Sequence, residues 1–299
     1  MKPIVIYHAN CTDGFGAAYA AWRALGDDVE YIDAHYGELD DPATLEERFG
    51  SDIGQRDVYI LDFSLKRPAM DWLFDKAQRV VWLDHHKTAF EMWCDTPNVQ
   101  RYHLGSWPGR HIMLDNNKSG ALLAWEYFHQ GGPVPLVIQH IDDRDRWQWK
   151  LPGSAAIHMA LWNHKPWSFA QWDDLLANPG DLREMGLTLL GYQERQVEAS
   201  VEKARPCAIN PAPMTGAGIP GLAVNTPTHI SEVGNELAKK SGTYGLVWYF
   251  DGSQQRAMCS LRSIGDYDVS AIAKVFGGGG HKNAAGFNID MQTLLEWMK

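Results

Sequence analysis

The chain has 299 residues, 45% of them hydrophobic, which is enough for two domains with buried cores. Its 37 Asp and Glu residues outnumber 27 Lys and Arg, and the net charge of −10 argues against sequence-independent binding to long duplex DNA. Widely spaced cysteines (Cys11, Cys94, Cys207 and Cys259), with no apolar signal or membrane-spanning run, predict a cytoplasmic protein with free thiols and no membrane partner.

The first half of the chain alternates apolar strands with amphipathic helices. A β-branched run at 3–7 predicts a buried strand, and apolar residues at helical spacing from Phe15 to Leu25 predict the helix that follows it. Further strands are predicted at 29–34, 58–61 and 80–83, with a helix at 70–77. This alternation is typical of an α/β fold with a doubly wound, mostly parallel sheet.

The second half predicts a long helix and then a smaller α/β lobe. Residues 119–128 predict a helix capped by Ser119, and 134–141 predict either a helix with Pro135 in its first turn or a short strand. A long helix is predicted over 181–205, stopped by Pro206. We therefore expect a catalytic lobe at 1–180, a linker helix at 181–208 and a C-terminal lobe at 209–299, with the active-site cleft between the lobes.

Side chains that bind metals stand at the ends of four predicted elements. They are His8, Asp13, Asp62, Asp84, His85, His86, Asp142, Asp143 and Asp145. Because the carboxyl ends of parallel strands meet at one edge of a sheet, these groups can converge. One aspartate after a strand is often only a helix cap, but four coincident cases favour a metal centre. Imidazole and carboxylate ligands suit Mn²⁺, Fe²⁺ or Zn²⁺, and a two-metal cluster could activate a bridging water against a phosphorus–oxygen bond.

Four ordered segments resemble the motifs of the DHH phosphoesterase superfamily. They are His8 with Asp13-Gly14, Leu61-Asp62, Leu83-Asp84-His85-His86 and Asp145-Arg146-Trp147. This superfamily contains manganese-dependent enzymes, among them RecJ-type exonucleases, nanoRNases and cyclic-dinucleotide phosphodiesterases. The resemblance implies that His8, Asp13, Asp62, His85 and Asp145 bind metal, with Asp62 as the bridging carboxylate. It also implies that Asp84 binds metal or orients a ligand, and that His86 acts on the substrate as an electrophile or general acid.

The first of these motifs departs from the family pattern. The family usually supplies two carboxylates separated by one residue, and aligning Asp13 with the second leaves Cys11 at the first. Cys11 either packs without a metal or offers a thiolate ligand that would favour softer metals. Asp142 and Asp143 are less certain ligands than Asp145, and capping or solvated roles are favoured for both.

A run of four glycines, 277–280, precedes His281 near the end of the chain. Four consecutive glycines cost conformational entropy, which a close approach to a ligand with inward N–H groups would explain; a flexible linker is the alternative. The run resembles the Gly-Gly-Gly-His signature of the DHH-associated domain, and Ser260-Leu261-Arg262-Ser263 resembles a strand whose arginine contacts a phosphate in that domain. The resemblance implies a substrate-binding set of Arg262, Ser263, Gly279, Gly280 and His281.

Together these features predict a phosphodiesterase that uses two Mn²⁺ ions, or else Mg²⁺, Co²⁺ or Fe²⁺, to hydrolyse short oligonucleotides to 5′-mononucleotides. The expected partner is a short oligonucleotide or dinucleotide, and a homodimer is left open. Close alternatives are hydrolysis of a linear or cyclic dinucleotide, or removal of phosphate from a 3′-phosphoadenosine compound. An alternative of another class is a nucleotide-binding sensor that has lost turnover because Cys11 replaces a ligand.

Overall fold

The structure, a computed structural model, describes residues 1–93, 104–107, 109–210 and 218–298. The chain forms two compact units, Met1–Leu190 and Gly191–Lys299, each with its own six-stranded sheet. The division falls inside helix α9 (Pro179–Val201), within the segment predicted to link the lobes. Cys11, Cys207 and Cys259 are free thiols, and Cys94 lies outside the described residues.

The sheet of the first unit has the strand order β2-β1-β3-β4-β6-β5. Its strands are β1 (Ile4–His8), β2 (Glu30–Ala34), β3 (Asp57–Leu61), β4 (Arg79–Asp84), β5 (Leu104–Trp107) and β6 (Arg110–Leu114). All pair in parallel except β5, which is antiparallel to β6 at the edge. The predicted α/β class with a mostly parallel sheet is therefore confirmed.

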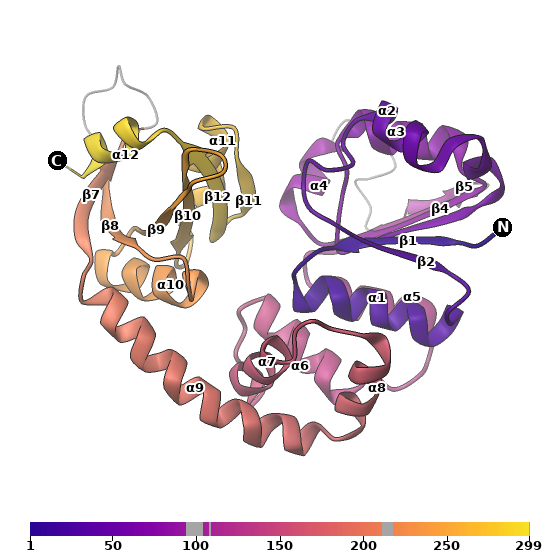
Figure 1. Cartoon of the computed structure of the whole chain (residues 1–299), viewed down its shortest axis with the longest axis horizontal. Helices are drawn as coiled ribbons and strands as arrows, with labels where there is room; N and C mark the ends of the chain where they lie inside the picture. Colours follow the sequence, from indigo (N-terminus) through magenta and orange to yellow (C-terminus); the bar gives the residue numbers. More distant parts are fainter. Residues whose placement is uncertain (94–103, 108, 211–217, 299) are drawn as a thin grey trace. The chain divides into compact units, whose positions relative to one another are not determined.

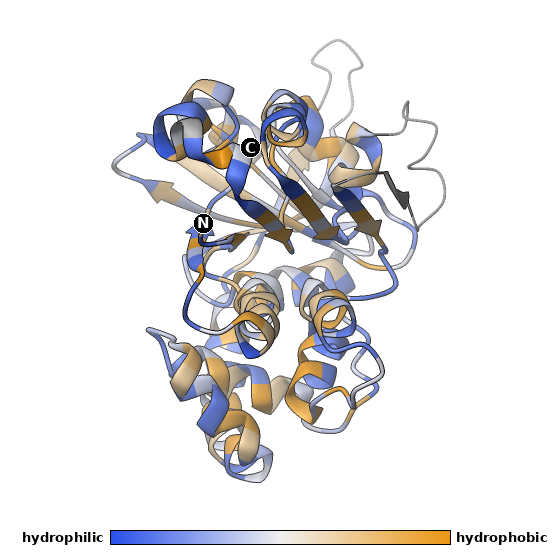
Figure 2. Cartoon of the chain, turned by 90° about the vertical axis from the view of Figure 1, so that its right-hand side faces the viewer, coloured by the Kyte–Doolittle hydropathy of each residue, from blue (hydrophilic) through white to orange (hydrophobic). Residues whose placement is uncertain are grey.

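Helices cover both faces of this sheet (Figure 1). Helices α2 (Pro42–Phe49), α3 (Arg67–Lys76) and α4 (Lys87–Met92) cover one face, with the 3-10 turn η1 (Gly50–Gln55), and α1 (Thr12–Leu25) and α5 (Gly120–Phe128) cover the other. Beneath α1 and α5 lie α6 (Leu136–Asp145), α7 (Ser154–Asn163) and α8 (Phe169–Ala177). Hydrophobic and hydrophilic residues alternate around these helices, so each can turn an apolar side inward (Figure 2).

Strand register brings the predicted ligands to one edge of the sheet. The central strands are apolar on both faces and fully buried, as the continuous run Ile4-Val5-Ile6 illustrates. Tyr7 pairs with Leu61, and Leu61 pairs with Leu83. The predicted site residues His8, Asp62 and Asp84 directly follow these three positions. The carboxyl edge of β1, β3 and β4 therefore carries the candidate site.

The second unit has a mixed sheet in the order β11-β12-β10-β9-β8-β7. Its strands are β7 (Arg205–Ile209), β8 (Ile219–Asn225), β9 (Tyr244–Asp251), β10 (Arg256–Ser263), β11 (Gly279–His281) and β12 (Ala284–Ile289). Helix α10 (Ile230–Ser241) and the end of α9 pack on one face, and α11 (Val269–Val275) and α12 (Met291–Trp297) pack on the other. The predicted smaller α/β lobe is confirmed.

Two predicted elements differ from the structure. The long helix ends at Val201 instead of Arg205, because the following Pro206 disfavours helical backbone at Arg205, and Arg205–Ile209 forms strand β7. The segment 134–141, left open between helix and strand, is helix α6, which begins directly after Pro135. No helix among the described residues has the length and apolar character needed to cross a bilayer.

Candidate metal centre

Four side chains from four elements meet around His85, directly after β4. Its Nε2 atom lies 3.0 Å from Asp62 Oδ1, 3.4 Å from Asp13 Oδ2 and 3.6 Å from Asp145 Oδ2. Asp13 comes from the first turn of α1, Asp62 follows β3, and Asp145 ends α6. The structure therefore brings these four predicted ligands together, although they span more than 130 positions of the chain.

His8 and Cys11 form a second set with the same Asp62. His8 Nδ1 lies 3.7 Å from Asp62 Oδ2, and the ligand atoms of His8, Cys11 and Asp62 all lie within 4.8 Å of one another. The ligand atoms of Asp13, His85 and Asp145 meet the same limit. Asp62 therefore lies between two neighbouring sets of possible ligands, with one oxygen toward His8 and the other toward His85. Cys11 thus belongs to the cluster and does not pack apart from it.

Asp62 has the environment of a metal ligand. It is 1% exposed, and neither carboxylate oxygen accepts a hydrogen bond. A buried carboxylate without hydrogen bonds is costly unless a positive charge is supplied. Burial favours the neutral acid, but His8 and His85 outweigh it and hold the pKa of Asp62 well below its ordinary value. The donors present therefore fit a divalent cation of the Mn²⁺, Fe²⁺ or Zn²⁺ type.

Asp13 ties this cluster to helix α5. Its Oδ2 accepts the Gly120 N–H at 2.7 Å, and its Oδ1 accepts the Ala121 N–H at 2.8 Å, so the carboxylate caps the start of α5. Burial, followed by the charges of Asp62 and Asp145, raises the pKa of Asp13 well above its ordinary value. Three carboxylates this close repel one another, and a bound cation would relieve that repulsion.

The histidines respond to the same charge. Burial lowers the pKa of His8, but the neighbouring side chains of Asp62 and Cys11 outweigh burial and raise it to about 11. Burial likewise lowers the pKa of His85, and Asp62 and Asp145 raise it well above its ordinary value. Because a cation binds the neutral form of imidazole, metal binding at these histidines would release protons.

Asp84 orients His86. Its Oδ1 accepts the backbone N–H groups of His85 at 2.7 Å and of His86 at 3.1 Å, and it lies 2.7 Å from His86 Nδ1. A carboxylate at Nδ1 favours the tautomer with its proton on that nitrogen, which leaves Nε2 as the working atom of the ring. Asp84 Oδ2 is buried and accepts no hydrogen bond. Asp84 was predicted to bind metal or to orient a ligand; it orients His86, and its carboxylate also lies within 4.8 Å of the ligand atoms of Asp62 and His86.

Asp142 and Asp143 accept hydrogen bonds from backbone N–H groups, in line with the capping role that was favoured for them from the sequence. Asp142 Oδ1 accepts the Ser119 N–H at 2.7 Å. Asp143 accepts the N–H groups of Lys150 at 2.7 Å and Leu151 at 3.1 Å, and the Ser154 hydroxyl at 2.6 Å. These bonds fix the chain on either side of Asp145.

Tyr36 is a candidate site residue that was not predicted. It follows β2, and its ring centroid lies 5.0 Å from that of His8 and 5.8 Å from that of His86. Tyr36 as a whole is 49% exposed, but desolvation of its hydroxyl, and then the charges of Asp84 and Asp62, raise the pKa of Tyr36 well above its ordinary value. The rule that selected the ends of β1, β3 and β4 also covers the end of β2, so the signal was present in the sequence.

Two glycines allow helices α1 and α5 to pack closely against the strand ends at the site. A Cβ atom added at Gly14 would lie 2.2 Å from the carbonyl oxygen of His8, and one added at Gly120 would lie 2.3 Å from Asp62 Cβ. Helices α1 and α5 can therefore approach the strand ends only because glycine stands at these positions. Gly14 was part of a recognised motif, whereas Gly120 carried no pattern that pointed to Asp62.

In the second unit, Arg262 and His281 share one face of the sheet. Arg262 pairs with Ala284 across β10 and β12, and His281 pairs with the same Ala284 across β11 and β12. Residues directly opposite in antiparallel strands point to the same side, so both side chains flank a small alanine. The Arg262 guanidinium donates to Ser231 Oγ at 2.9 Å. Ser263 is buried and donates its hydroxyl to the Tyr267 carbonyl at 2.6 Å, an interaction within the unit.

Close packing against strand β12 explains why glycines occur in the run at 277–280. Gly277 has φ +77° after helix α11. A Cβ atom at Gly278 would lie 2.0 Å from the Gly286 carbonyl oxygen, and one at Gly280, with φ +140°, would lie 2.4 Å from the Ala284 carbonyl oxygen. Gly279 and Gly280 pair with β12 as strand β11, so close backbone packing, and not a flexible linker, accounts for these glycines.

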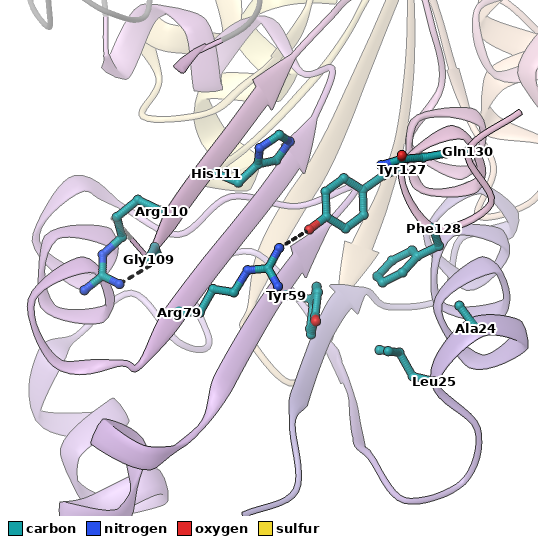
Figure 3. Close-up of a pocket in the computed structure, with 10 residues that line it drawn as sticks. All are labelled: Ala24, Leu25, Tyr59, Arg79, Gly109, Arg110, His111, Tyr127, Phe128 and Gln130. Atoms are coloured by element: carbon teal, nitrogen blue, oxygen red, sulfur yellow. Dashed lines mark hydrogen bonds between the residues drawn. The ribbon is translucent and has the colours of Figure 1, made fainter. Parts of the chain in front are cut away.

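A separate cavity of about 490 Å³ lies at the opposite, amino edge of the first sheet (Figure 3). It is lined by Tyr59, Arg79 and His111 from the strands and by residues at the ends of α1 and α5. Arg79 donates to the Tyr127 hydroxyl at 2.7 Å, as the dashed line in Figure 3 shows. None of the predicted ligands lines this cavity.

Comparison with known proteins identifies a domain family and several proteins that this chain resembles. The DHHA1 domain family matches residues 222–298. The uncharacterized protein R106 of Acanthamoeba polyphaga mimivirus is 29% identical over 296 residues, covering 95% of this chain and 66% of that protein. Oligoribonuclease NrnB of Bacillus subtilis is 22% identical over 316 residues, covering 95% of this chain and 72% of its own length. The chain thus spans about two thirds of these relatives. The pGpG-specific phosphodiesterase PggH of Vibrio cholerae gives a TM-score of 0.48 at 13% identity, covering 99% of this chain and 96% of that one.

Proposed function

We propose, from the premise that the chain belongs to the DHH phosphoesterase superfamily and carries a DHHA1 domain in its second unit, that it is a metal-dependent phosphoesterase acting on nucleotides. Our finer proposal is a Mn²⁺-dependent phosphodiesterase that hydrolyses short oligonucleotides to 5′-mononucleotides. The similarity to an oligoribonuclease over 95% of the chain supports this substrate class.

The observation that carries the proposal is Asp62. Both its carboxylate oxygens are buried and accept no hydrogen bond, while His8 Nδ1 lies 3.7 Å from one and His85 Nε2 lies 3.0 Å from the other. A role confined to folding would pair these oxygens with N–H donors, as Asp142 and Asp143 are paired. A carboxylate that bridges two cations accounts for both oxygens at once.

We assign His8, Cys11 and Asp62 to one cation and Asp13, His85 and Asp145 to the other, with Asp62 shared. Two such ions, when bound, supply an activated water and stabilise the charge on the reacting phosphate. Asp84 holds the His86 ring through Nδ1, and we propose that His86, when both ring nitrogens carry a proton, donates the proton on Nε2 toward the leaving oxygen. Asp84 and His86 therefore work together.

In the second unit, we propose that Arg262, Gly279, Gly280 and His281 bind the nucleotide. A guanidinium binds phosphate in a bidentate manner, and the alanine between Arg262 and His281 leaves space for a flat group or a phosphate on that face. Ser263 was predicted to contact substrate as well. Its hydroxyl is engaged with Tyr267 and Asn283, so we propose that it fixes the loop behind Arg262.

The test is product analysis with a substrate panel. The full chain with Mn²⁺ is offered pApA, longer RNA and DNA oligomers, cyclic dinucleotides and 3′-phosphoadenosine 5′-phosphate in parallel. Rapid conversion of pApA to mononucleotide, with slow attack on long strands, is the expected result. Preference for a cyclic dinucleotide or for the 3′-phosphate would replace the substrate and keep the reaction class. Nucleotide binding without turnover, and without a need for Mn²⁺, would favour the sensor alternative and reject the enzyme.

Arg262→Ala is expected to raise KM for a dinucleotide by about tenfold while kcat changes little, because it removes a charged hydrogen bond to a part of the substrate that does not react. Steady-state kinetics with pApA measure both constants. Arg256→Ala is the matched control, since Arg256 lies on the same strand and sheet face but at the far end. A loss confined to kcat would place Arg262 at the reacting phosphate instead.

A further inference from the structure

Lys165 is held beside the metal centre without a counter-ion. Its ammonium donates to the side-chain oxygen of Asn10 and lies 3.4 Å from the Asn10 carbonyl oxygen. It sits 3.3 Å from the centre of the Trp162 ring and 4.4 Å from that of Trp167. In the part of the chain that the structure describes, no carboxylate lies within ion-pair distance of Lys165. The protein has a net charge of −10, so a half-buried lysine that pairs with no carboxylate is unusual and suggests a functional role.

Two further nitrogen-bearing side chains, His158 and Arg144, share this environment. His158 comes from α7, and its Nδ1 lies 3.4 Å from the Thr12 hydroxyl. Burial, and then the charges of Arg144 and Lys165, hold the pKa of His158 well below its ordinary value. His158 and Lys165 also lie against the same ring, since the His158 ring centroid is 6.0 Å from that of Trp162 and the Lys165 ammonium is 3.3 Å from it. We call Lys165, Arg144 and His158 the Lys165 edge.

The Lys165 edge lies next to the metal centre, because its residues contact or directly precede proposed metal ligands in the chain. Asn10, which holds Lys165, precedes Cys11, whose ligand atom lies within 4.8 Å of those of His8 and Asp62. Arg144 precedes Asp145. Helix α1 begins at Thr12 without a side-chain cap, so the positive end of its dipole faces the same place. All these groups belong to the first unit, so their positions do not depend on the second.

We propose that the Lys165 edge is a subsite for a second phosphate of the substrate, the terminal 5′-phosphate next to the phosphodiester that is cleaved. This inference rests on the proposed function and adds a preference for 5′-phosphorylated dinucleotides over unphosphorylated ones. A phosphate would supply the counter-ion that Lys165 lacks, and Arg144 could bind it in a bidentate manner. Neutral His158 would contribute a hydrogen bond without adding charge.

The test compares pApA with ApA on the full chain with Mn²⁺. Wild type is expected to show kcat/KM at least about tenfold higher for pApA, the size expected for hydrogen bonds to a charged group. Lys165→Gln should reduce this ratio toward one, and Lys165→Arg should restore most of it. Lys2→Gln is the matched control: it removes the same charge from an exposed lysine paired with Asp28, and should keep the wild-type ratio.

A binding measurement separates this inference from the proposed function. Dinucleotides with an uncharged methylphosphonate linkage, with and without a 5′-phosphate, cannot be hydrolysed and differ only in the terminal group. The 5′-phosphate should tighten wild-type binding about tenfold and Lys165→Gln binding hardly at all. Equal affinities in wild type, or an equal loss for both ligands in Lys165→Gln, would overturn the subsite. If wild type hydrolyses no dinucleotide, the proposed function fails, and the affinity ratio still decides on the subsite.

Discussion

Replacing Asp62 by asparagine is expected to lower kcat by about 10³-fold or more while the fold persists, because several kcal/mol of transition-state stabilisation are lost with the cations. The substitution keeps the shape of the side chain and removes its charge. No hydrogen bond is broken, since neither oxygen of Asp62 accepts one. Without metal, the variant should be less stable than wild type, because the charge of Asp62 that His8 and His85 stabilise in the folded state is lost.

The measurements are hydrolysis of pApA and thermal unfolding with and without Mn²⁺. Wild type should gain about 2.7 kcal/mol of stability at a metal concentration 100 times Kd, and Asp62→Asn should lose most of that gain. Asp28→Asn removes the same charge from an exposed carboxylate and should behave like wild type in both assays. Near-wild-type turnover by Asp62→Asn would show that the two-cation interpretation is wrong.

The candidate site could be predicted from sequence because its geometry follows from strand ends. His8, Asp62 and Asp84 are the first residues past three positions in register, Tyr7, Leu61 and Leu83. Apolar runs identify such strands, and parallel pairing brings their ends to one edge. The same rule covers Tyr36 after β2, but it was passed over because tyrosine is not a usual metal ligand and β2 is only partly buried.

Other features depend on tertiary contacts that no local pattern records. Strand β6 (Arg110–Leu114) carries a charge and a histidine in five residues, so it lacked the apolar run that marks its neighbours. The glycine run was interpreted through a ligand, whereas β12 lies close enough to exclude a side chain at Gly278 and Gly280. Gly120 shows the same limitation, since the need for glycine arises from Asp62, 58 positions away.

Gly120→Ala is expected to damage the site through a single methyl group. The added Cβ would lie 2.3 Å from Asp62 Cβ and 2.6 Å from Asp62 Oδ1, so either Asp62 or the start of α5 must move. The Gly120 N–H also binds Asp13, which means that a shift of α5 displaces a second ligand. We expect a loss of stability of about 1–3 kcal/mol, as in overpacked cores, and a fall in kcat of about 100-fold from misplaced ligands.

Gly180→Ala is the matched control for this methyl group, because it makes the same change in α9 with no atom within 4 Å of the new Cβ. It should leave activity unchanged and leave stability unchanged or slightly higher. A double-mutant cycle then identifies the partner. In an Asp62→Gly background no Cβ remains at 62, so Gly120→Ala should cost little stability, and the coupling should equal most of its single-variant cost. Additive costs would instead mean that the methyl group acts through some other neighbour, and that Gly120 does not set the position of Asp62.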